Sequence, residues 1–211
     1  MTRHTASDLS ASAPLIVYGV MAALSVGILS ACNRSSIETR AWLHISPLFG
    51  HVLSIALGGL LAATTIRITR HSVRHWDWAR VLHGHLQPAV RGAHGQTLFV
   101  LGALGAASEE LFFRGLLMTT LGLTLSSLMF GLLHQVRGRA RWIWVGWATL
   151  MGVLFGMLFL ATGSLLGSIF AHATINVVNL HFLRNTELDP PTRKLGGLLA
   201  MPPRPTKSPP C

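Results

Sequence analysis

Charged side chains are scarce in this chain of 211 residues. Asp, Glu, Lys and Arg together make up 11% of it, about half the share found in soluble domains. Half of the residues are hydrophobic, and the mean hydropathy is +0.50. This composition argues against an ordinary soluble domain and indicates a membrane protein.

Cysteine is nearly absent, since Cys32 and Cys211 are the only two. Two cysteines support neither a disulfide framework nor a thiolate metal cluster. The run Leu29-Ser30-Ala31-Cys32 resembles a lipoprotein processing box, which leaves lipidation of Cys32 open. We favour a retained helix, because the region before it holds one arginine and an aspartate and because the chain re-enters the membrane repeatedly.

Long apolar runs predict an all-α protein, a polytopic membrane helix bundle with about six transmembrane helices. A hydrocarbon core of about 30 Å requires about 20 apolar helical residues. The candidate segments are 14–32, 43–66, 96–120, 121–135, 142–162 and 164–183. The fourth, which a break near Gly122 separates from the third, is too short to span unaided. We expect it to be partly buried among its neighbours.

The formal net charge of +10 would suggest nucleic acid in a soluble chain. The placement of the basic residues along the chain indicates the membrane topology instead. If the N-terminus is cytoplasmic, the inner segments 1–13, 67–95, 136–141 and 184–211 hold 14 Lys and Arg, whereas only Arg34 and Arg40 lie outside. The positive-inside rule is then satisfied. We therefore predict a multi-pass protein of the cell (inner) membrane with both termini cytoplasmic and no nucleic-acid partner.

Two polar regions flank the later apolar segments. Residues 67–95 carry five histidines interleaved with Trp76 and Trp78. A metal site is one interpretation, but a short helix at the lipid headgroups is favoured. Residues 184–211 hold seven of the ten prolines and are expected to form a disordered basic tail.

The fifth segment carries small residues at a spacing of four, namely Ala148, Gly152 and Gly156. Residues four apart share one helical face, and small ones let two backbones approach closely. This pattern predicts a helix-packing surface and implies no chemistry.

Polar residues within the apolar segments are candidates for chemistry, because a charge at mid-bilayer depth costs about 2.5 to 3.5 kcal/mol on insertion scales. They are Glu109, Glu110 and Arg114 in the third segment, His134 in the fourth, and His172 and Asn176 in the sixth. Carboxylate, imidazole and carboxamide groups can activate a water molecule and stabilise an oxyanion. A structural ion pair, hydrogen bonds between helices and a transporter's proton relay are the competing interpretations.

Three short motifs in this order resemble those of the CAAX protease and bacteriocin-processing family, also called the Abi or type II CAAX prenyl endopeptidase-like family. Residues 109–114 match its EExxxR motif, 130–134 its FxxxH motif and 172–176 its HxxxN motif. The match covers about 96–183, which would form a four-helix catalytic core. Residues 1–95 would supply two further transmembrane helices and the basic interfacial stretch.

The resemblance implies a glutamic-type intramembrane endopeptidase acting on a membrane-anchored peptide or protein tail. Glu109 would be the general base and would polarise a water together with His134. His172 and Asn176 would donate to the oxyanion. Glu110, Arg114 and Phe130 would have supporting roles.

Two alternatives stay open beside this mechanism. If the enzyme were metal-dependent, Glu109, His134 and His172 could hold Zn²⁺. No HExxH sequence or cysteine ligand accompanies them, so we favour a site without metal or other cofactor. A non-catalytic binding or bacteriocin-immunity protein with the same fold is the alternative function.

Overall fold

The computed structural model describes residues 12–136, 138 and 140–188. Its elements in chain order are α1 (Ser12–Ala31), α2 (Pro47–His75), α3 (Asp77–Val90), α4 (Gly95–Glu110), the π-helix η1 (Leu111–Leu117), α5 (Met118–Leu121), α6 (Leu123–Leu133), α7 (Arg141–Thr162) and α8 (Leu166–Asn185). Within this part the only β pairing is an isolated bridge between Glu38 and Ser164. The all-α class is confirmed. Most of the predicted tail, from residue 189 on, lies outside the described residues.

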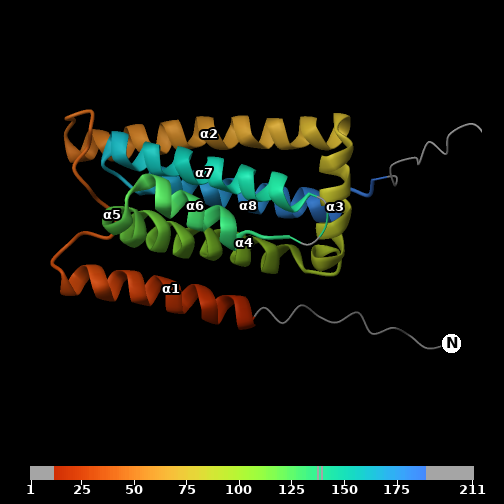
Figure 1. Ribbon diagram of the computed structural model, residues 1–211, viewed down its shortest axis with the longest axis horizontal. Helices are drawn as coiled ribbons and strands as arrows, with labels where there is room; N and C mark the ends of the chain where they lie inside the picture. The colour runs from red at the N-terminus through yellow and green to blue at the C-terminus, as the bar shows by residue number, and fades with distance from the viewer. Residues whose placement is uncertain (1–11, 137, 139, 189–211) are drawn as a thin grey trace, which may run out of the picture.

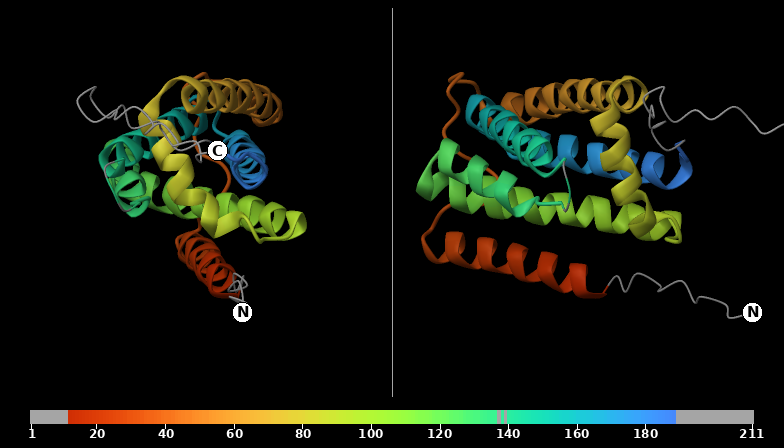
Figure 2. Two further views of the ribbon diagram at one scale, coloured as in Figure 1. Left: turned by 90° about the vertical axis from the view of Figure 1, so that its right-hand side faces the viewer. Right: turned by 45° about the vertical axis from the view of Figure 1, so that its right-hand side comes forward.

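The long helices lie side by side, and α3 crosses one end of the bundle (Figures 1 and 2). Helix α8 packs between α2 and α4, and α6 packs on α7. Helix α1 lies at the margin, against α4 and η1. The segments before and after residue 95 therefore belong to one bundle.

Four helices of the described chain are long and apolar enough to cross a membrane, namely α1, α2, α7 and α8. The third predicted segment is helical from Gly95 to Leu121, but η1 interrupts its α-helical geometry. It ends at Gly122, whose φ of +84° suits glycine. Helix α6 has 11 residues and, at 1.5 Å per residue, is roughly 16 Å long. It is too short to span unaided, as the sequence predicts.

One end of the bundle carries most of the described basic residues. The last turns of α2, helix α3, the first turn of α7 with Arg141 and the last turn of α8 with Arg184 meet there (Figure 1). Arg34 and Arg40 lie in the 32–46 connection at the opposite end. The two charge groups of the sequence are thus at opposite ends of the helices.

Residues 67–75 correct one expectation, because they continue α2 to His75 instead of starting a loop. Arginine can extend its long side chain past a helix end, so Arg67, Arg70 and Arg74 do not interrupt the helix. Residues 77–90 do form the expected short helix, α3, which buries Leu82.

Small residues set the closest helix contacts. The predicted face of Ala148, Gly152 and Gly156 is buried on α7, and a side chain on Gly152 would contact Ser127 of α6. A second stripe went unpredicted, although its spacing of four is present in the sequence. It consists of Gly50, Ser54, Gly58 and Ala62 on α2, all buried. A Cβ on Gly58 would collide with the carbonyl of Gly167, which brings α2 directly against α8.

Candidate active site

The candidate carboxylates sit where the third predicted segment changes helical type. Glu109 and Glu110 end α4, and the seven residues of η1 follow at once. A π-helix bonds i to i+5, is rare, and is often found at functional sites. Hydropathy periodicity does not reveal such a turn, so the sequence did not predict it.

Glu110 and Arg114 form a buried ion pair. Arg114 Nη1 lies 2.7 Å from Glu110 Oε1, and both side chains are at most 2% exposed. The pairing expected from the spacing of four is confirmed. The guanidinium also lies 4.3 Å from the centre of the Phe130 ring and 5.3 Å from that of Phe155. Aromatic faces stabilise a cation held away from water, so the pair is built into the core.

His172 of α8 contacts the same carboxylate. Its Nδ1 lies 2.8 Å from Glu110 Oε1. An ionised carboxylate only accepts hydrogen bonds, so His172 donates from Nδ1 and turns Nε2 toward Glu109. The ring of Phe155 stacks on the imidazole at 5.1 Å. Neither this bond nor this stacking is visible in the local spacing of the sequence.

His134 follows the last residue of α6. Its Nδ1 lies 2.7 Å from the carbonyl oxygen of Phe130, which can only accept, so this nitrogen also donates. The Phe130 ring packs on the imidazole at 4.2 Å. Phe130 therefore contacts both His134 and Arg114, consistent with its expected supporting role.

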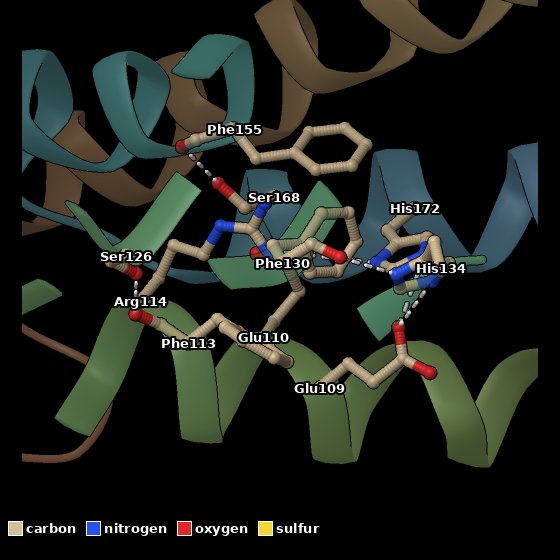
Figure 3. Close-up of polar contacts among 10 residues, drawn as sticks. All are labelled: Glu109, Glu110, Phe113, Arg114, Ser126, Phe130, His134, Phe155, Ser168 and His172. Atoms are coloured by element: carbon tan, nitrogen blue, oxygen red, sulfur yellow. Dashed lines mark hydrogen bonds and ion pairs between the residues drawn. The ribbon is translucent and has the colours of Figure 1, made fainter. Parts of the chain in front are cut away.

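Glu109 faces both imidazoles (Figure 3). Its Oε2 lies 3.5 Å from His134 Nε2 and 3.8 Å from His172 Nε2. This oxygen is buried and has no hydrogen-bond partner in the described chain. Because each Nδ1–H is already engaged, neutral imidazoles would present lone pairs from Nε2. Three acceptors then face one point, and a water molecule or a proton is the complement they require.

Asn176 lies one turn beyond His172 on α8 and is half-buried. Its side chain makes no hydrogen bond with another residue of the described ranges. The structure therefore brings together Glu109, Glu110, Arg114, Phe130, His134 and His172 and leaves Asn176 outside this bonded group. Its amide is available to another molecule.

The carboxylate and two imidazoles are chemically suited to Zn²⁺. However, the described residues contain no group of three or more His, Cys, Asp or Glu side chains arranged to hold a metal ion. The histidines of residues 67–95 likewise form no such group in the described chain. His71 and His75, for example, stack on one another at 4.1 Å along α2. If the site bound Zn²⁺, Glu109, His134 and His172 would hold it.

The part of the chain that carries these residues is similar to known proteins. Residues 95–178 match the family model of type II CAAX prenyl endopeptidase Rce1-like proteins. The uncharacterized protein YpbD of Bacillus subtilis (strain 168) is 36% identical over 81 residues, which are 38% of this chain and 42% of that protein. The chain thus spans less than half of this relative. No solved structure matches. Residues 95–178, which contain all three motifs, are thus similar to the Rce1-like type II CAAX prenyl endopeptidases.

Proposed function

We propose that the protein is an intramembrane endopeptidase that hydrolyses a peptide bond in a membrane-anchored peptide or protein tail. The observation that carries this proposal is the convergence of Glu109 Oε2 with the Nε2 atoms of His134 and His172. The tautomers of His134 and His172 are set by fixed acceptors, the Phe130 carbonyl oxygen and Glu110 Oε1. The match of residues 95–178 to a family model of prenyl endopeptidases supports it further.

The attacking water would bind between Glu109 and His134. It would donate one hydrogen to Glu109 Oε2 and one to His134 Nε2, which leaves an oxygen lone pair for the scissile carbonyl carbon. As the new C–O bond forms, Glu109 takes the proton. When the C–N bond breaks, Glu109 gives that proton to the departing amine. No metal takes part in these reaction steps.

The oxyanion would be stabilised from α8. His172 can donate from Nε2 only when the ring also carries a proton there, because its Nδ1–H is bound to Glu110. The carboxylates of Glu109 and Glu110 would stabilise that cation. Asn176, which has no partner in the described chain, would supply a second donor. Preorganised donors of this kind contribute most where water is excluded.

Water would reach the site from the arginine-bearing end. After α6 ends at Leu133, the described residues of its connection to α7, namely 134–136, 138 and 140, are not helical. Non-helical backbone at membrane depth is tolerated where it lines a water-filled cavity or is buried in protein. We place this end, and both termini, in the cytoplasm, and the bundle in the cell membrane.

A paired comparison of N-terminal and C-terminal peptides tests the function. Membranes that contain the wild-type chain are compared with membranes that contain Glu109→Gln, which keeps the shape and removes the base. Glu187→Gln is the matched control, because Glu187 is exposed and its one ion pair within the described chain is with Arg91. A cleavage product absent only from Glu109→Gln is expected.

Identical peptides in all three membranes would overturn the proposal. If deletion of the gene still gave a phenotype, a non-catalytic binding or bacteriocin-immunity role would then be the better account.

A further inference from the structure

A second concave site lies away from the carboxylates, at the arginine-bearing end of the bundle. It is an open groove of about 520 Å³ between α2, α4 and α8. Its lining includes Arg70, Phe99, Val178, His181, Phe182 and Asn185. The walls are therefore mainly apolar, and the polar groups gather toward the ends of α2 and α8.

Arg70 supplies a positive charge that is not neutralised within the described part of the chain. Its guanidinium lies 5.1 Å from the centre of the Phe182 ring, and its Nε is buried without a hydrogen-bond partner. No carboxylate of the described chain pairs with it. The two described acidic residues at this end, Asp77 and Glu187, are held by Arg80 and Arg91.

His181 and Asn185 add polar groups beside this charge, one turn apart on α8. His181 Nδ1 lies 2.8 Å from the carbonyl oxygen of Val177, so it donates there and its Nε2 remains open. Asn185 is exposed at the end of α8. The Asn185 side-chain amide can donate to a phosphate placed near Arg70, whereas His181 can donate from Nε2 only when its ring is protonated.

Phe99 completes the apolar side of the groove. Its side chain is 58% exposed on α4, and with Val178 it extends the apolar lining away from the polar groups. An anionic headgroup joined to a hydrocarbon chain matches this division, and basic pockets between transmembrane helices are known to bind such lipids.

We propose that the groove binds one acidic phospholipid, with its phosphate at Arg70 and an acyl chain along Phe99 and Val178. A zwitterionic lipid would match the apolar wall but would add its own cation beside Arg70. The inference is independent of proteolysis, because none of these residues belongs to the site around Glu109.

Native mass spectrometry of the full chain in detergent micelles, with equal amounts of phosphatidylglycerol and phosphatidylcholine, tests the proposal. The wild-type chain should retain one phosphatidylglycerol in preference to phosphatidylcholine. Arg70→Gln should weaken phosphatidylglycerol binding about fivefold, since one arginine near a lipid surface contributes about that factor. Arg74→Gln is the matched control, because Arg74 lies exposed on the same helix outside the groove.

A second variant separates the groove from general surface charge. Val178→Phe keeps every charge but fills the apolar wall, and it should also lower phosphatidylglycerol retention. Thermal unfolding of each variant verifies that it is folded. Equal retention of the two lipids, equal losses from Arg70→Gln and Arg74→Gln, or full displacement by inorganic phosphate would each overturn the proposal.

Discussion

His172 donates its Nδ1–H to Glu110 Oε1 across 2.8 Å, and Arg114 Nη1 donates to the same oxygen across 2.7 Å. One carboxylate oxygen thus joins α8 to η1. The second glutamate of the motif therefore does more than neutralise an arginine. It also sets the tautomer of the histidine that faces Glu109.

Removal of the Glu110 charge should destabilise the protein strongly. Glu110→Gln leaves the Arg114 charge buried and unpaired, which typically costs about 3 to 5 kcal/mol. The double variant Glu110→Gln with Arg114→Met removes both charges and should recover part of that loss. Denaturant unfolding in micelles measures both free energies. A double variant that is less stable than Glu110→Gln alone would contradict this account.

Replacement of His172 should separate folding from chemistry. In His172→Asn the amide N–H lies near the position of Nδ1 and can still donate to Glu110, but nothing replaces Nε2. We expect a free energy of unfolding within about 1 kcal/mol of that of wild type. Cleavage should be slowed by about a hundred- to a thousandfold. His172→Phe should lose both stability and cleavage activity. Cleavage of the identified product, followed beside thermal unfolding, checks this, and full activity in His172→Asn would remove His172 from the reaction.

Metal removal should leave cleavage unchanged. In the proposed step water is activated by Glu109 and His134 alone, so a strong chelator should not alter the rate of product formation. The measurement is repeated after addition of zinc to the chelated protein. Loss of activity with the chelator and recovery with zinc would replace the metal-free mechanism by one in which Glu109, His134 and His172 hold the ion.

Glycine substitutions should distinguish helix contact from helix propensity. A Cβ on Gly167 would collide with the Ser54 carbonyl, whereas one on Gly27 in α1 meets nothing within 4 Å. Gly167→Ala should cost about 1 to 3 kcal/mol, and Gly27→Ala should be neutral or stabilising by up to about 1 kcal/mol. Unfolding in micelles compares them. Equal effects would mean that α2 and α8 do not pack as closely as the structure shows.

Cysteine labelling should reveal the orientation. Cys32 is exposed at the end opposite α3. In a Cys211→Ser background, a membrane-impermeant maleimide should label it in intact cells. A cysteine at Gly92, in the α3–α4 connection, should react only after permeabilisation once Cys32 is also replaced by serine. The reverse pattern would invert the topology. An unreactive Cys32 with added lipid mass would establish lipidation.

Local spacing in the sequence predicts the helices and the Glu110–Arg114 pair, because both depend on residues four apart. It also places His172 and Asn176 on one face of α8. The bond from His172 to Glu110 joins residues 62 positions apart, so no local pattern contains it. The stacking of Phe155 on His172 is hidden for the same reason. Hydropathy does not register the π-helix η1 either.

The short α6 has a consequence for the surrounding lipid. Leu128, Leu132 and Leu133 are exposed on it, yet the helix covers only about half of a 30 Å hydrocarbon core. Lipid chains beside α6 therefore meet a shorter apolar surface than a full-length helix would present. A bilayer adapts to a short hydrophobic surface by thinning locally. The protein would in this way shorten the distance between an aqueous phase and a peptide bond anchored in the membrane.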